Sequence, residues 1–189
     1  MRKLIAKAWM TLDGVFDADN MDTWFDPYNS DARAAHIQET ILGSDAFIYG
    51  RTTYQMLAPY WSTLENNEFG IADRLNEAPK YIVSSTLQDA DWDNSTIISD
   101  NVVEAIANLK EQPGQDIMID GSATLVQSLM DRDLLDEYQL VVHPVIMGSG
   151  KHYFKDGMDM TRLELIQTKP LDLGVIVMRY QPTIATEEA

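Results

Sequence analysis

Two short glycine turns carry the clearest chemical signal in this sequence. Each follows an apolar run rich in β-branched or aromatic residues, at 46–49 and at 117–119. A strand that stops at glycine and turns into a helix leaves backbone N–H groups unpaired, with the helix dipole behind them. Such a turn is suited to binding phosphate. The turn residues are Gly50, Arg51, Thr52 and Thr53, then Asp120, Gly121, Ser122, Ala123 and Thr124. Two such turns favour a ligand with a long phosphate-bearing body, and a dinucleotide fits best.

Further candidate groups lie beside these turns. Ser84, Ser85 and Thr86 end the next strand-like run, at the carboxyl edge where open α/β sheets bind ligands. Their hydroxyls could hold a ribose or a phosphate, or could cap a helix. Residues 13–29 have no clear periodicity, and irregular segments of this length often cover active sites. Their aromatic side chains, Phe16, Trp24, Phe25 and Tyr28, could stack on a flat ring or fasten the segment to the core.

Several classes of chemistry are absent from the sequence. It contains no cysteine, which excludes disulfides, thiolate nucleophiles and cysteine-based metal sites. His36, His143 and His152 lack the spacing of metal ligands, so no metal is expected. His143 lies within an apolar strand-like run and is interpreted as a packed residue. No Gly-x-Ser-x-Gly elbow, Walker loop or Rossmann Gly-x-Gly-x-x-Gly occurs.

The charge balance restricts the partners. The 189 residues include 14 basic and 30 acidic side chains, which gives a formal net charge of −16. Such a chain repels the phosphates of nucleic acids and anionic membranes, so we expect neither as a partner. No apolar stretch approaches the ~18–20 residues of a membrane span. The first residues lack the long apolar region of a signal peptide, and a cytoplasmic location is expected.

The turns must be positioned by an alternation of strands and helices. Strand-like runs occur at 3–9, 46–49, 81–84, 96–99, 116–119, 138–145, 163–168 and 175–180. Ser30 can cap a helix to about Leu42, Asn101 with Glu104 has the spacing of a capping box, and residues 122–130 form another helical pattern. Alternation in the first two-thirds predicts parallel pairing, and the strands-only final third predicts an antiparallel edge. We therefore expect one α/β domain over residues 1–182, followed by a disordered tail at 183–189.

Taken in order, these segments resemble the dihydrofolate reductase-like fold, and within it the RibD C-terminal group, the reductase domain of riboflavin biosynthesis. The resemblance covers essentially the whole chain. Its matching segments are residues 11–14 (TLDG), 50–54 (GRTTY), 80–87 (KYIVSSTL), 120–125 (DGSATL), 135–138 (LDEY), 144–150 (PVIMGSG) and 174–182.

The resemblance implies a three-layer fold and a role for each motif. The first glycine turn, Gly50 to Thr53, would contact the phosphates of NADPH. The Ser84–Thr86 segment would hold the adenosine ribose and its 2′-phosphate. Gly121, Ser122, Ala123 and Thr124 would receive the pyrophosphate. Leu12 and Asp13 would lie where substrate and nicotinamide meet, with Asp13, or a water it positions, as proton source or substrate anchor. Trp24 and Phe25 would close over the ring.

The implied activity is an NAD(P)H-dependent reductase that passes hydride to a small heterocyclic or carbonyl substrate, as in reduction of 5-amino-6-(5-phosphoribosylamino)uracil. The implied partners are a small-molecule substrate and a second copy of the chain. Two departures from the family pattern leave alternatives open. Relatives usually carry arginine at the position of Ser85, where it pairs with the 2′-phosphate, so NADH is a rival to NADPH. Asp120 would repel pyrophosphate unless it turns away, which favours a second hypothesis: a non-catalytic relative that binds another nucleotide-like metabolite.

Overall fold

The computed structural model describes residues 1–183, which contain one eight-stranded sheet. Its strands are β1 (Leu4–Thr11), β2 (Ser44–Gly50), β3 (Lys80–Val83), β4 (Ser95–Ile98), β5 (Asp116–Asp120), β6 (Glu137–His143), β7 (Leu163–Pro170) and β8 (Ile176–Pro182). They are ordered β4-β3-β2-β5-β1-β6-β8-β7. The first six in this order run parallel, whereas β8 pairs antiparallel with β6 and β7 pairs antiparallel with β8. The predicted fold class, mostly parallel with antiparallel C-terminal strands, is confirmed.

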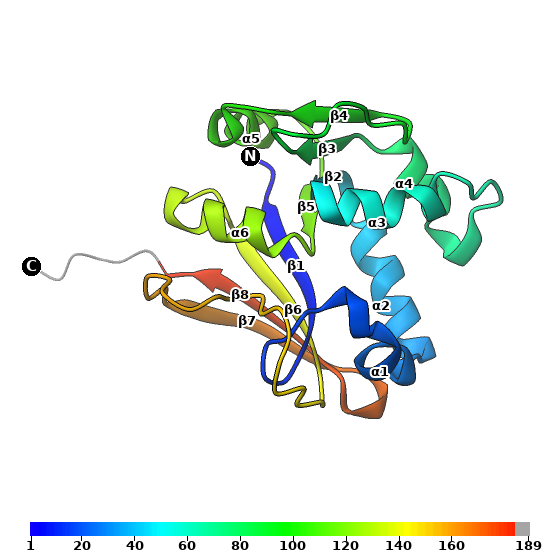
Figure 1. Cartoon of the computed structure of the whole chain (residues 1–189), viewed down its shortest axis with the longest axis vertical. Helices are drawn as coiled ribbons and strands as arrows, with labels where there is room; N and C mark the ends of the chain where they lie inside the picture. The colour runs from blue at the N-terminus through cyan, green and yellow to red at the C-terminus, as the bar shows by residue number, and fades with distance from the viewer. Residues whose placement is uncertain (184–189) are drawn as a thin grey trace, which may run out of the picture.

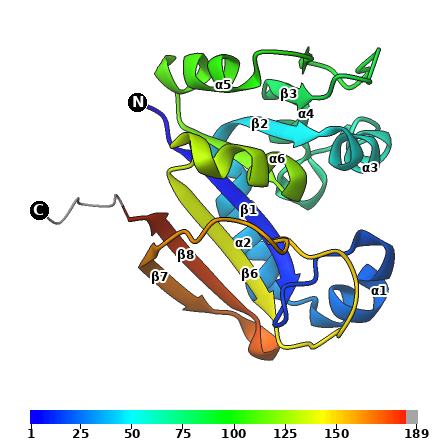
Figure 2. The same cartoon turned by 60° about the vertical axis from the view of Figure 1, so that its left-hand side comes forward.

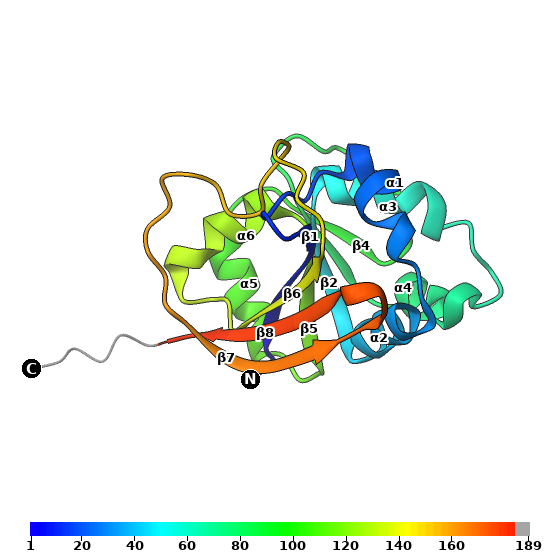
Figure 3. The ribbon, with the colours of Figure 1, turned by 90° about the horizontal axis from the view of Figure 1, so that it is seen from below.

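Helices cover both faces of the sheet and produce three layers (Figures 1 and 3). The helices are α1 (Met21–Trp24), α2 (Asp31–Leu42), α3 (Arg51–Trp61), α4 (Ala72–Glu77), α5 (Val102–Glu111) and α6 (Ala123–Leu129). Helices α5 and α6 lie on one face, and α2, α3 and α4 lie on the other. The segment after β1, expected to be irregular, contains α1 between two short 3-10 turns.

Each face of the sheet has its own apolar core because side chains alternate along a strand. Leu4, Ala6 and Met10 of β1 pack beneath α5 and α6. Phe47 and Tyr49 of β2 pack with the helices of the opposite face. The parallel strands are buried on both sides, so they appear in the sequence as nearly continuous apolar runs. This packing fixes the carboxyl ends of β1, β2 and β5 at one edge of the molecule.

Two predictions about helix starts had different outcomes. The Ser30 cap of α2 is confirmed, since its hydroxyl accepts a hydrogen bond from the backbone N–H of Arg33 at 3.2 Å. The Asn101–Glu104 capping box is wrong. Asn101 has a φ of +46° and makes no side-chain bond to the helix. In this left-handed conformation its amide donates instead to Asp100, at 3.3 Å.

The C-terminal strands form the edge of the sheet (Figure 2). Strand β7 exposes Leu165 and Ile166 on this edge, and pairing of two chains there stays a prediction. The predicted tail falls mainly on residues 184–189, outside the described residues. Thr183, its first residue, donates its backbone N–H to the carbonyl of Arg162 at 2.9 Å.

The buried ammonium of Lys80, in β3, caps the carboxyl end of α4 and gives a testable prediction. The Lys80 ammonium, fully buried, donates to the carbonyls of Leu75, Asn76 and Ala78 at 2.7–3.0 Å. Lys80→Met would leave these carbonyls without their donor. We expect a loss of about 2–4 kcal/mol in the free energy of unfolding, measured by urea denaturation. The exposed Lys155→Met is the control, and an equal effect of the two changes would contradict the capping role.

Candidate functional site

The two glycine turns open on one cleft of about 1140 Å³ at the carboxyl edge of the sheet. One wall comes from the starts of α3 and α6, and the other comes from α2 and the segment after β1. The predicted residues that line it are Gly50, Arg51, Thr52, Thr53, Gly121, Ser122, Ala123, Thr124, Trp24 and Phe25. The topology thus brings together turns that are about 70 residues apart in the chain.

The Ser122 hydroxyl joins the two turns. It accepts a hydrogen bond from the Gly50 backbone N–H at 2.8 Å and lies 3.0 Å from the Thr53 hydroxyl. Gly121 has a φ of +60°, a conformation that favours glycine. The first residues of α3 and α6 line the same cleft, and a helix leaves its first backbone N–H groups without intrahelical partners. The arrangement can therefore cradle a phosphate-bearing ligand.

A cation and two hydroxyls cluster at the outer end of this cradle. The Arg51 guanidinium donates to the Thr86 hydroxyl at 2.7 Å. The Ser84 hydroxyl accepts the backbone N–H groups of Thr86 and Leu87, at 3.2 and 3.0 Å. Ser85 is exposed beside them, and none of residues 84–86 lines the main cleft. Arg51 thus supplies positive charge next to Ser85.

An ion pair between a buried lysine and a partly exposed aspartate lies at the floor of the cleft. The Lys7 side chain is 2% exposed, and its ammonium lies 3.7 Å from the Asp120 carboxylate. The same ammonium lies 5.1 Å from the centre of the Trp9 ring. Asp120 is therefore paired with a cation. The sequence analysis missed Lys7, although a lysine inside the apolar run of the first strand was a usable signal.

Aromatic side chains and an arginine form the wall opposite the turns. Trp24 is buried and donates its indole N–H to the carbonyl of Asp17 at 3.0 Å, so it fastens the segment while also lining the cleft. The Arg33 guanidinium lies 4.0 Å from the centre of the Phe25 ring and donates to the Phe25 carbonyl. Its Nε has no hydrogen-bond partner among residues 1–183. The sequence analysis also missed Arg33, which lines the cleft.

His143 lies behind this wall, packed against Trp9, Trp24, Phe25 and Tyr28. It is fully buried and its Nδ1 lies 3.2 Å from the Met10 carbonyl oxygen, which confirms the interpretation of a packed residue. Burial lowers the pKa of His143 from 6.5 to about 4.

This buried histidine predicts a loss of stability in mild acid. The unfolded chain takes up the proton near pH 6.5, whereas the folded chain resists it until about pH 4. Stability therefore falls as the pH drops through this window, by up to about 3 kcal/mol. Urea unfolding between pH 7 and 4 should show a shallower pH dependence for His143→Leu than for His152→Gln, which changes an exposed histidine. Equal slopes would contradict the prediction.

Leu12 and Asp13 lie on the loop after β1 and are not among the residues that line the cleft. The Asp13 carboxylate accepts the Thr11 hydroxyl at 2.6 Å and the backbone N–H groups of Met147 and Gly148, at 3.2 and 2.7 Å. These bonds, the Thr11 one first, lower the pKa of Asp13 to about 2. The geometry favours an anchor between two loops over a proton source.

Two other predictions concern a metal site and a membrane span. Within residues 1–183 no three His, Asp or Glu side chains gather closely enough to hold a metal ion. No helix in the same range has the length and apolar character needed to cross a bilayer.

The comparisons with known proteins agree with this arrangement. The uncharacterized protein YyaP of Bacillus subtilis strain 168 is 28% identical over 181 residues, covering 95% of this chain and 94% of that protein. A Shewanella sp. PV-4 protein named after riboflavin biosynthesis superposes with a TM-score of 0.72 at 18% identity, covering 96% and 99% of the two chains. Dihydrofolate reductase from Enterococcus faecalis, in complex with NADP(H), gives a TM-score of 0.65 at 15% identity, covering 96% and 97%.

These structural likenesses establish the dihydrofolate reductase-like fold. The family model of the RibD C-terminal domain matches residues 2–177. The chain therefore belongs to the RibD C-terminal domain family.

Proposed function

We propose that this protein is an NADPH-dependent reductase that delivers hydride to a C=N or C=O carbon of a small heterocyclic or carbonyl substrate. The observation that carries the proposal is the single cleft shared by both glycine turns, with Arg51 in its lining and Lys7 at its floor. Membership in a reductase-domain family supports it.

The cleft residues fit a dinucleotide. A Cβ built at Gly50 would lie 3.4 Å from the Ser122 hydroxyl, so a side chain there would contact the hydroxyl that joins the two turns. The N–H groups of the two turns would hold the pyrophosphate, and Arg51 with Thr86 would hold the 2′-phosphate. NADPH, when bound, supplies the hydride.

The rest of the cleft would act on the substrate. Trp24 and Phe25 would orient a flat ring and exclude water. Arg33, beside Phe25 on this wall, would supply positive charge near the ring. The Lys7 ammonium would stabilise the negative charge that develops on the substrate nitrogen or oxygen, because it is held in the water-poor floor of the cleft.

Titration with NADPH and NADH, followed by nicotinamide fluorescence, tests the cofactor part of the proposal. We expect NADPH to bind, and Gly121→Ala to weaken binding at least about tenfold because the turn requires a positive φ. Gly157→Ala is the matched control, since Gly157 has a φ of +79° but faces open space. No binding of either cofactor at millimolar concentration would overturn the proposal.

The substrate part requires a separate screen. Pterins, ribosylaminopyrimidines and small carbonyl compounds would each be mixed with NADPH and the protein, and oxidation of NADPH would be followed by absorbance. Turnover of any of these compounds supports the reductase proposal. Cofactor binding with no turnover across the panel would favour the non-catalytic alternative.

A further inference from the structure

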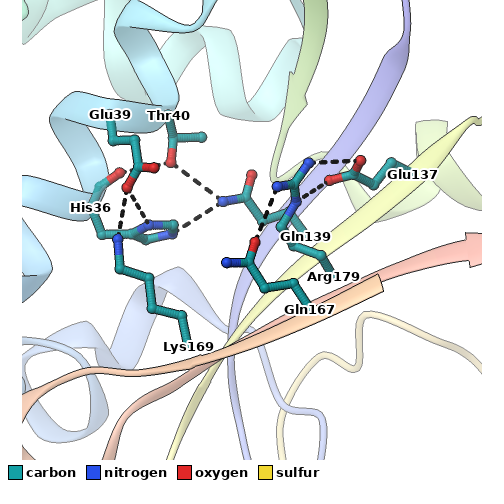
Figure 4. A network of polar contacts seen from close by, with 8 residues as sticks. All are labelled: His36, Glu39, Thr40, Glu137, Gln139, Gln167, Lys169 and Arg179. Carbon is teal, nitrogen blue, oxygen red and sulfur yellow. Dashed lines mark hydrogen bonds and ion pairs between the residues drawn. The ribbon is translucent and has the colours of Figure 1, made fainter. Parts of the chain in front are cut away.

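A second, smaller cavity lies beside the last two turns of α2. Its volume is about 200 Å³. It is on the same sheet face as the main cleft, because Ile5 lines it while Lys7, two residues along β1, lines the cleft. Its polar lining includes His36, Glu39, Gln139, Gln167, Lys169 and Arg179, contributed by α2, β6 and the C-terminal strands (Figure 4). None of these residues takes part in the proposed reductase site.

His36 brings an unused hydrogen-bonding atom to this cavity. Its side chain is only 4% exposed, and Nδ1 has no hydrogen-bond partner among the described residues. The amide nitrogen of Gln139 lies 3.1 Å from Nε2. The NH2 of the Gln139 amide can only donate, so Nε2 of His36 accepts this hydrogen bond. The proton of the neutral imidazole ring then lies on Nδ1. A buried donor without an acceptor is costly, and a ligand acceptor would remove that cost.

The exposed Glu39 side chain is the nearest acceptor. Its carboxylate lies 3.9 Å from His36 Nδ1, beyond hydrogen-bond reach, and accepts from the Lys169 ammonium at 2.7 Å (Figure 4). The Glu39 side chain is 68% exposed, so it can turn out to solvent without disturbing the core. An exposed ion pair of this kind is weak.

The charges around His36 favour an anion. Burial first, then the nearby charges of Lys7, Lys169 and Arg179, lower the pKa of His36 to about 4, and Glu39 opposes them. Arg179 is held by the buried Glu137 carboxylate at 2.5 and 2.9 Å. Asp116, on the cavity lining, is the other acidic group there. With Glu39 turned away, the Lys169 ammonium and the His36 Nδ1–H would lose their neighbouring carboxylate. Both donors would then face a partly enclosed space.

We propose that this cavity binds a small carboxylate-bearing metabolite, whose carboxylate takes the N–H of His36 and the ammonium of Lys169. The Glu39 carboxylate occupies the position expected for the ligand carboxylate, so the two compete for the same donors. The cavity has room for a simple organic acid. This site is separate from the reductase cleft and does not depend on the cofactor.

Titration of the full chain with acetate, followed through the imidazole ¹⁵N resonances of His36, tests the proposal. Acetamide, similar in shape but uncharged, is the ligand control. We expect acetate to shift the His36 Nδ1 resonance and acetamide to leave it unchanged. Glu39→Gln should bind acetate up to about fivefold more tightly, because the competing carboxylate is removed. Lys169→Gln should bind it more weakly than Glu39→Gln.

Glu164→Gln is the matched protein control. Glu164 is also exposed and also makes a polar side-chain contact, to Gln181, and its loss changes the net charge equally. If Glu164→Gln tightened acetate binding as much as Glu39→Gln, a general charge effect would replace the proposal. An unchanged His36 resonance in Glu39→Gln at 100 mM acetate, or an equal response to acetamide, would overturn it. If acetate bound to Glu39→Gln but not to the parent, the result would support the proposal and would mean that Glu39 is a strong competitor.

Discussion

Replacing Lys7 with methionine is expected to lower kcat about 10²- to 10³-fold, the usual cost of removing one group that stabilises developing negative charge. The ammonium is at the floor of the cleft, paired with Asp120 and almost fully shielded from bulk water. In this setting its charge is screened weakly, so its effect on the transition state is large. The glycine turns and Arg51 remain in this variant, so the cofactor keeps these contacts.

The change also leaves the Asp120 carboxylate without its partner, which could alter the fold or repel the cofactor pyrophosphate. The double variant Lys7→Met/Asp120→Asn removes both charges and separates these effects from the loss of the ammonium. Steady-state kinetics with the substrate found in the screen would measure kcat of each variant, and NADPH titration would measure its dissociation constant for the cofactor. If Lys7→Met kept kcat within about twofold of the parent, or if the double variant recovered full turnover, Lys7 would have no role in the reaction.

The sheet was predictable because its strands have a distinct sequence pattern. Runs such as 46–49 and 117–119 are apolar throughout, as expected for strands covered on both faces. The change to strands without helices after residue 138 marked the antiparallel edge. Helix starts were less predictable. Ser30 caps α2 as expected, but the same reasoning failed at Asn101 because the backbone there is left-handed.

The sequence predicted the backbone turns of the candidate site and Arg51, but it did not predict Lys7 or Arg33. The glycine turns could be located because a strand ending at glycine is a local pattern. The Arg51–Thr86 and Lys7–Asp120 contacts join residues 35 and 113 positions apart, and only the order of strands in the sheet brings them together. For the same reason, Asp120 alone suggested repulsion of a pyrophosphate, whereas the structure pairs it with a buried cation.

Arg51→Ala is expected to weaken NADPH binding about 10- to 100-fold and to leave NADH binding nearly unchanged. The two cofactors differ only in the 2′-phosphate, so the ratio of their dissociation constants isolates the contacts to that group. A charge-assisted hydrogen bond contributes about 1.5–3 kcal/mol, which corresponds to this loss. Arg51 is the cation of the cluster beside Ser84 and Thr86, and Ser85 can contribute only a hydroxyl.

Salt dependence gives a second, independent measure of the same contact. Because Arg51 is exposed, its attraction for the phosphate is screened by salt, so raising KCl should weaken NADPH binding to the parent more than to Arg51→Ala. Arg162→Ala removes another exposed arginine and controls for the change in net charge. Equal weakening of NADPH and NADH by Arg51→Ala would instead mean that Arg51 acts on a part common to both cofactors. The chain would then have no arginine to discriminate them at this edge of the sheet, and NADH would become the expected cofactor.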